Sequence, residues 1–285
     1  MNDGLPEDEL LMSHSPTSRY TGPAAAGSRE HQARVPDGSR TPRHGLAMLL
    51  AGVALSVLVL LAGLLAKTGP VSSLDLRVEQ HIAAQDRTSA LTTLARAVST
   101  IATPETVGVG LMIVVPGILV LAHRRLDALK VFCMFAGALT LAEIGKKLIN
   151  EHRPPASLWA MPADSGASYP SGHATAAAVL AVALVVVAAT LAGRSATLVL
   201  GGLYAVAVAG SRVYLADHYP PDVIGGMLCA VAAAFIVTGL AALPVLQPFL
   251  RRLDAPRAAT AEAKARVRSA GRGNLGWSGE SRRRR

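Results

Sequence analysis

The chain has 285 residues, of which 51% are hydrophobic, 16% are charged and 4% are aromatic. Soluble domains carry about 25% charged residues, so this composition argues against an ordinary soluble globule and favours a membrane protein. The net charge is +9. Aromatic residues are not interleaved with the basic residues of the C-terminal tail, which argues against nucleic-acid binding by this tail. Cys133 and Cys229 both lie inside apolar segments, which excludes a disulfide framework and a cysteine-based zinc site.

Six apolar segments are predicted to cross the bilayer, because a helical span needs roughly 20 mostly apolar residues. The segments are 45–66, 107–122, 127–149, 174–193, 195–211 and 223–250. The third is the weakest by hydropathy, since charged residues occupy its last turns. The sequence therefore predicts an all-α fold, a six-transmembrane helix bundle.

Short amphipathic helices are predicted between the first and second spans. Two groups of apolar residues recur there at helical spacing. They are Leu74, Val78 and Ile82, followed by Leu91, Leu94, Val98 and Ile101. We expect these helices to lie on the outer surface and cover the bundle, with a lid or lipid gate as the alternative function.

The predicted organisation has three parts: a disordered segment 1–44, a transmembrane domain 45–250 and a basic disordered tail 251–285. The first span reads as an uncleaved anchor, because 44 largely polar residues precede it. The side that holds both ends carries 20 of the 28 Lys and Arg residues. The bias of positive charge towards the cytoplasm predicts that both ends face the cytoplasm in a multi-pass inner-membrane protein. The basic tail either enforces this topology or binds anionic lipid heads.

Polar residues cluster in three stretches that the predicted topology places at the outer membrane face. Residues 146–154 close the third span, residues 169–173 open the fourth, and residues 211–222 join the fifth to the sixth. Charged groups near membrane spans are costly and tend to mark function. We therefore expect the three stretches to form one polar site.

The residue types in these stretches suit a phosphate ester. Lys146, Arg153 and Arg212 place three cations at the same predicted depth in the membrane. Guanidinium groups match phosphate oxygens well. Ser171 stands at a predicted helix N-cap with Gly172 after it, and a helix start of this kind is an anion-binding site.

Two histidines and an aspartate accompany these cations. His173 and His218 change charge near neutral pH, and Asp222 lies where it can hold the His218 imidazole in one tautomer. Because few carboxylates accompany the cluster, we expect catalysis with no metal and no cofactor. Asp217, beside His218, either raises the pKa of a histidine or faces water, and we expect it to face water.

The three stretches resemble the signature of the type 2 phosphatidic acid phosphatase family, which runs K-x6-R-P, then P-S-G-H, then S-R-x5-H-x3-D. Lys146 to Pro154, Pro170 to His173 and Ser211 to Asp222 match it in order and spacing. Tyr169 precedes the second motif where the family more often has phenylalanine, and we expect no loss of chemistry from this difference.

The resemblance implies residue roles. His218 would be the nucleophile that forms a phosphohistidine, Asp222 would orient it, and His173 would be the general acid and then the base. The remaining matched residues would hold the phosphate oxygens, namely Lys146, Arg153, Ser171, Gly172 and Arg212.

The predicted function is therefore a lipid phosphatase acting on a phosphomonoester or pyrophosphate at the outer membrane face. The candidate substrates implied by the resemblance are phosphatidic acid, phosphatidylglycerol phosphate and a polyprenyl diphosphate such as undecaprenyl diphosphate. One alternative is a vanadate-binding haloperoxidase, which shares the constellation, although six apolar spans argue against it. Another is a non-catalytic membrane protein that binds lipid head groups or other anions.

Overall fold

The computed structural model describes residues 42–188 and 194–254, and these residues form helices joined by turns and loops. The α-helices follow in this order: α1 Pro42–Ala66, α2 Gly69–His81, α3 Ser89–Ile101, α4 Pro104–Val109, α5 Val115–Leu121, α6 Arg125–Ile149, α7 Gly172–Ala188, α8 Arg194–Tyr214, α9 Pro220–Ala241 and α10 Gln247–Asp254. Two π-helical turns, Ile82–Asp86 and Gly110–Val114, and a 3₁₀ turn, Ala156–Leu158, complete the set.

The described residues contain five helical segments long and apolar enough to cross a membrane, together with one shorter apolar helix. The five are Arg43–Ala66, Ser89–Leu121, Arg125–Ile149, Ser195–Tyr214 and Pro220–Ala241, and the shorter one is Gly172–Val185 in α7. An all-helical membrane fold was predicted, and this prediction is confirmed. The weak third span is a complete helix, α6, of 25 residues.

Three predicted boundaries need adjustment. The sixth span was expected to reach Leu250, but α9 ends at Ala241 and a turn precedes α10. This break accords with Pro244, since proline interrupts a continuing helix. Residues 42–44 and 251–254, expected to be disordered, lie in α1 and α10. The remainder of both predicted disordered segments, like residues 189–193 of the fourth span, lies outside the described residues.

The bundle is built around α7, which packs against α4, α6, α8 and α9. Its inward face consists largely of alanine and valine, such as Ala176 and Val179, and it meets Phe135 of α6 and Val208 of α8 in one core cluster. Small residues let membrane helices approach closely, so that van der Waals contacts can hold them together. Large apolar side chains on the outside of α1 and α8, such as Leu61 and Leu203, are exposed, as lipid-facing residues should be.

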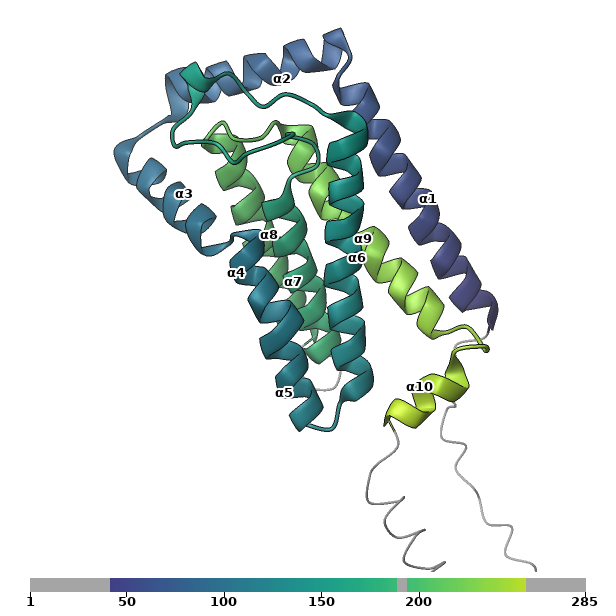
Figure 1. Cartoon of the computed structure of the whole chain (residues 1–285). Helices are drawn as coiled ribbons and strands as arrows, with labels where there is room; N and C mark the ends of the chain where they lie inside the picture. The colour runs from purple at the N-terminus through teal and green to yellow at the C-terminus, as the bar shows by residue number, and fades with distance from the viewer. Residues whose placement is uncertain (1–41, 189–193, 255–285) are drawn as a thin grey trace, which may run out of the picture. The chain divides into compact units, whose positions relative to one another are not determined.

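Helix α1 packs along α9 through glycines (Figure 1). A Cβ atom at Gly52 would lie 2.8 Å from the backbone nitrogen of Ile236, and one at Gly239 would lie 2.5 Å from the backbone nitrogen of Leu49. Real Cβ atoms essentially never approach so closely, so only glycine permits this spacing. The contact fixes the first span against the last one.

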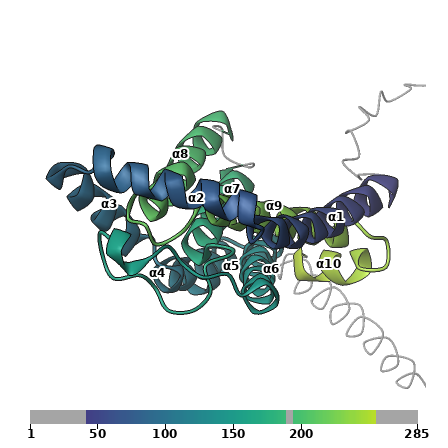
Figure 2. The same ribbon diagram turned by 90° about the horizontal axis from the view of Figure 1, so that it is seen from above.

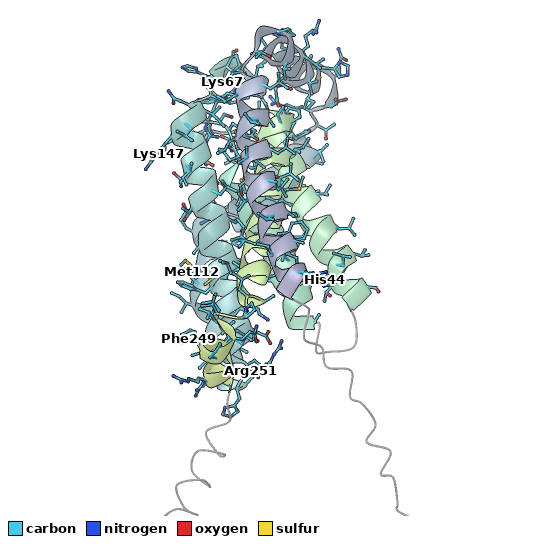
Figure 3. All side chains as sticks on the ribbon, turned by 90° about the vertical axis from the view of Figure 1, so that its right-hand side faces the viewer. His44, Lys67, Met112, Lys147, Phe249 and Arg251 are labelled. Carbon is cyan, nitrogen blue, oxygen red and sulfur yellow. The ribbon has the colours of Figure 1, made fainter. Side chains whose placement is uncertain are left out.

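Helix α2 lies across one end of the bundle, which we call the α2 end (Figures 1 and 2). Lys67 and Lys147 lie at this end, whereas Phe249 and Arg251 lie at the other (Figure 3). Both amphipathic helices were predicted, but the apolar stripe is not the buried face. Leu74 is exposed, while Asp75 and Glu79 of α2 are buried. In α3, likewise, the buried residues are Ala95 and Ser99.

Candidate active site

The three polar stretches meet at the α2 end of the bundle. His173 begins the fourth span, Arg212 lies in the last turn of α8 and Asp222 lies in the first turn of α9. The loop from 150 to 171 adds Arg153 and runs beneath α2 (Figure 1). Arg212 and His218 each retain only 1% of their exposure, so the site is built within the protein and not on its surface.

The P-S-G-H stretch forms the start of α7. Ser171 precedes the helix, its backbone nitrogen donates to the backbone oxygen of Asp222 at 3.0 Å, and its hydroxyl accepts from the nitrogen of Ala174 at 3.4 Å. A Cβ at Gly172 would lie 3.7 Å from Nζ of Lys146, so the lysine ammonium lies beside this helix start. Lys146 also pairs with Glu143 at 3.0 Å, as expected for residues one turn apart.

His218 is held from its Nδ1 side. Nδ1 lies 3.3 Å from Oδ2 of Asp222 and 3.3 Å from the hydroxyl of Ser168. The same Asp222 oxygen accepts hydrogen bonds from the Ser168 hydroxyl and, at 2.9 Å, from the nitrogen of Tyr219. A carboxylate fixed in this way orients the imidazole, as the aspartate does in a serine-protease triad.

The other imidazole nitrogen faces charged groups. Nε2 of His218 lies 3.3 Å from Nη1 of Arg153 and 3.2 Å from Oδ2 of Asp217. Burial lowers the pKa of His218, although the hydrogen bond and the charge of Asp222 oppose this shift. The imidazole is therefore biased towards the neutral form, which a nucleophilic nitrogen requires.

Asp217 does not face water, and that expectation was wrong. Its side chain is fully buried, and Oδ2 pairs with Nη1 of Arg153 at 2.6 Å and with Nη2 of Arg212. The reason is electrostatic: two guanidinium groups taken out of water need a counter-charge close by. Asp217 supplies it, and its Oδ1 also accepts from the nitrogen of Asp164 at 2.8 Å.

Asp164 is a second carboxylate that the sequence did not single out. Its Oδ2 lies 3.2 Å from Nδ1 of His173 and 2.8 Å from Nη2 of Arg212. The hydrogen bond to His173 holds the pKa of Asp164 well below its usual range, with Arg212 contributing and partial burial opposing. The His173 ring is thus anchored through Nδ1, which leaves Nε2 for other contacts.

The sequence analysis also did not predict several residues that hold the site residues and their loop in position. Ser168 binds both Asp222 and His218, and Ser99 of α3 accepts a hydrogen bond from Nη1 of Arg212. Arg96 of α3 donates through Nε to the backbone oxygen of Ala160 at 3.1 Å. No motif or periodicity marks these residues, because their importance comes from loop and helix positions that only the fold brings together.

Within the described residues, one group of side chains has the spacing of a metal site, namely Asp164, Asp217 and His218. Both carboxylates are already paired with arginine. A metal ion would have to displace these guanidinium groups or accept their positive charge beside it, so the donor set fits a divalent cation poorly.

Comparison with known proteins agrees with this architecture. Residues 127–242, which contain all three motifs, match the family model of the PAP2 superfamily. An undecaprenyl-diphosphatase from Sulfolobus acidocaldarius is 32% identical over 124 residues, which make up 42% of this chain and 57% of that protein. The chain thus spans less than two thirds of the length of this curated relative.

A solved structure shows the same fold. The crystal structure of a transmembrane PAP2 type phosphatidylglycerolphosphate phosphatase from Bacillus subtilis matches with a TM-score of 0.59 at 24% identity. The match covers 66% of this chain and 94% of that one. With its three motifs assembled at one end of a helical membrane bundle, the chain is similar to the PAP2 superfamily over residues 127–242 and shares the fold of this transmembrane phosphatase.

Proposed function

We propose that the protein is a membrane-embedded phosphatase that hydrolyses a lipid phosphomonoester or lipid diphosphate through a phosphohistidine on His218. The observation that carries this proposal is the position of the His218 ring, with Nδ1 3.3 Å from Asp222 and Nε2 3.3 Å from Arg153. One nitrogen is thus oriented by a carboxylate, while the other faces a cation able to bind a phosphate oxygen.

In the first step the lone pair on Nε2 of His218 attacks phosphorus, and the bond from phosphorus to the lipid oxygen or bridging oxygen breaks. His173 gives its Nε2 proton to that leaving oxygen, while its Nδ1 stays anchored by Asp164. Asp222 supports the positive charge that develops on the His218 ring.

In the second step water attacks the phosphorus of the phosphohistidine. His173, now neutral at Nε2, takes a proton from that water, the phosphorus–nitrogen bond breaks, and His218 regains its lone pair. Phosphate leaves, and both histidines return to their starting protonation states.

The cations of the site would stabilise charge on the phosphate oxygens, which is the main catalytic requirement of phosphoryl transfer. Arg153, Arg212, Lys146 and the start of α7 at Ser171 and Gly172 would hold these oxygens. Nε of Arg212 is buried and makes no hydrogen bond to any part of the described chain, so a donor is available to an incoming anion. Because arginines can supply the positive charge, we propose a reaction without a metal ion.

An apolar groove at the α2 end offers a place for a lipid chain. A groove of about 420 Å³ is lined by residues that include Ile82, Leu91, Val213, Tyr214 and Ile224. Val213 and Tyr214 directly follow Arg212 in the last turn of α8, and this groove is the place that we propose for a lipid tail. The curated relative is named as an undecaprenyl-diphosphatase, which makes undecaprenyl diphosphate the first substrate to test.

The charge distribution supports a reaction at the outer face of a cytoplasmic membrane. Most Lys and Arg residues belong to the end opposite α2 or to the chain ends, and positive charge favours the cytoplasmic side. The α2 end, which contains the site, would then face outwards.

The test is phosphate release by the purified protein from undecaprenyl diphosphate, phosphatidylglycerol phosphate and phosphatidic acid, in the presence of a chelator. We expect His218→Ala to lower turnover by about 10³-fold or more, since loss of a covalent nucleophile has effects of this size. His152→Ala, at an exposed histidine nearby, is the matched control and should keep the wild-type rate. Full turnover in His218→Ala would refute the nucleophile assignment, and activity only with added metal would refute the metal-free mechanism.

A further inference from the structure

Ser168 is a buried serine that takes no part in the chemical steps proposed above. It lies in the loop before α7, and none of its surface is exposed. Its backbone nitrogen donates to the backbone oxygen of Glu151 at 2.8 Å, which fixes the loop at this residue. Its hydroxyl contacts two side chains of the site, Asp222 and His218, so the direction of each of these hydrogen bonds matters.

The contact with Asp222 determines where the hydroxyl proton points. A serine hydroxyl has one proton to donate and two lone pairs that accept. Oδ2 of Asp222 accepts from the Ser168 hydroxyl and, at 2.9 Å, from the backbone nitrogen of Tyr219. A carboxylate oxygen can only accept, so the proton of Ser168 is used in its bond to Asp222. Oγ of Ser168 can then offer only a lone pair to any further partner.

The further partner of Ser168 is the ring of His218. Nδ1 of His218 lies 3.3 Å from Oγ of Ser168 and 3.3 Å from Oδ2 of Asp222. A neutral imidazole has a proton on one ring nitrogen and a lone pair on the other. Nδ1 faces two acceptors, and this arrangement is favourable only when Nδ1 carries the ring proton. The surroundings of Nδ1 therefore select one tautomer.

The surroundings of Nε2 select neither tautomer. Nε2 of His218 lies 3.3 Å from Nη1 of Arg153 and 3.2 Å from Oδ2 of Asp217. The guanidinium group can bond only to a lone pair on Nε2, whereas the carboxylate can bond only to a proton there. These two preferences oppose each other. The hydrogen bonds made by one ring nitrogen determine the state of the other, so the choice falls to the Nδ1 side.

We propose that Ser168 is a positioning residue that keeps the ring proton of His218 on Nδ1 and the lone pair on Nε2. One hydroxyl acts twice, since it holds the Asp222 carboxylate by donating to it and accepts the Nδ1 proton of His218. The effect on turnover rests on the function proposed above, in which Nε2 attacks phosphorus, whereas the tautomer itself does not depend on that function.

Removing the hydroxyl should disturb this arrangement in a defined way. In Ser168→Ala, Nδ1 keeps Asp222 as its acceptor, but Asp222 loses one of the donors that hold it, and Asp217 still favours a proton on Nε2. Part of the His218 population should then carry its proton on Nε2, where it blocks attack on phosphorus. Substrate binding should change little, because among the described residues the hydrogen bonds of Ser168 run to Glu151, Asp222 and His218.

The tautomer is tested first, by nitrogen-15 NMR of the full-length protein labelled at histidine, in lipid nanodiscs at about pH 8. Burial lowers the pKa of His218, so its ring is neutral there. A ring nitrogen without a proton resonates far downfield of one with a proton, and coupling to the Cδ2 hydrogen distinguishes Nε2 from Nδ1. The signals of His218 are identified by their absence from His218→Gln.

We expect the wild type to carry the proton on Nδ1 and Ser168→Ala to show a mixture of both tautomers. Ser165→Ala, at an exposed serine of the same loop, is the matched control and should keep the wild-type pattern. A wild-type proton on Nε2 would refute the proposal. An unchanged pattern in Ser168→Ala would refute it too, since Asp222 alone would then hold the proton. Both outcomes are independent of whether the protein is a phosphatase.

Turnover is tested second. Ser168→Ala should lower kcat by about tenfold to a hundredfold with little change in KM, the usual effect of losing a hydrogen bond to a charged group. Ser165→Ala should keep the wild-type kcat, and thermal melting shows that each variant is folded. A raised KM with an unchanged kcat would assign Ser168 to substrate binding and refute the positioning role. If the wild type releases no phosphate from any lipid tested, the proposed function fails, while the NMR result still decides the tautomer.

Discussion

At the scale of single residues, Asp217 supplies the negative charge that balances the arginines of the candidate site. Its carboxylate lies between the guanidinium groups of Arg153 and Arg212, and it is also 3.2 Å from Nε2 of His218. In the proposed reaction a phosphate group must share these arginines with Asp217. The residue therefore does two opposing things, since it stabilises the empty site and competes with the anion that the site would bind.

Asp217→Asn should make this competition visible. Removing one partner of a buried ion pair costs roughly 3–5 kcal/mol, so we expect a lower melting temperature without ligand. The arginines then lack their internal counter-charge, and added vanadate or phosphate should raise the melting temperature more in the variant than in the wild type. Thermal melting over a phosphate titration measures both effects. Equal stabilisation of the two proteins by phosphate would contradict this account of Asp217.

At the scale of elements, the position of α1 depends on close contact with α9. Gly52 and Gly239 face the backbone of the opposite helix at distances that leave no room for a Cβ. Tyr169 extends the contact to the site, because its buried hydroxyl binds the backbone oxygen of Val59 in α1. Helix α1 is thus a support for the loop that carries Ser168 and Ser171.

Gly52→Ala should therefore destabilise the protein. The added methyl group would lie 2.8 Å from the backbone nitrogen of Ile236 and 2.9 Å from the backbone oxygen of Ala232, so α1 has to move away. Overpacking of this kind costs about 1–3 kcal/mol, which should appear as a lower melting temperature in detergent. Gly202→Ala is the matched control, since nothing lies within 4 Å of its added Cβ. A melting temperature for Gly52→Ala equal to that of the control would show that the helices are not in tight contact.

At the scale of the whole molecule, buried acids make the stability depend on pH. Burial raises the pKa of Glu79 to about 8, with Arg87 opposing the shift, and it raises the pKa of Asp75 to about 6. Both acids lie on α2, which covers the end of the bundle that contains the site (Figure 2). Because the folded chain holds protons that the unfolded chain releases, the free energy of unfolding decreases as the pH rises from about 4, the ordinary carboxyl pKa, to the raised values of about 6 and 8.

We expect the melting temperature to fall between pH 6.5 and 8. Each raised carboxyl contributes at most about 1.4 kcal/mol of lost stability per pH unit there. His218 has a lowered pKa and acts in the opposite direction, but only below about pH 6.5, where the unfolded histidine becomes charged. Glu79→Gln should flatten the decline, whereas Glu105→Gln should leave it unchanged. A decline that is identical in Glu79→Gln and the wild type would show that Glu79 is not the source.

Much of this molecule follows from local patterns in the sequence. Long apolar runs determine the membrane helices, because backbone groups in lipid must be paired within the helix. Even the weak third span folds as α6, since its charges are confined to the end at the polar site. The motif spacing likewise identified residues that the fold brings to one end, such as Arg153, His173 and His218.

The tertiary structure decided what lies next to these residues. The apolar stripe of α2 predicted a helix, but only packing shows that Asp75 and Glu79 turn inwards while Leu74 is exposed. Asp217 reads as a surface residue until two arginines from other elements surround it, and Asp164 and Ser168 carry no sequence pattern. The reason is physical: helix formation depends on neighbours a few residues away, whereas burial and ion pairing depend on side chains that are distant in sequence.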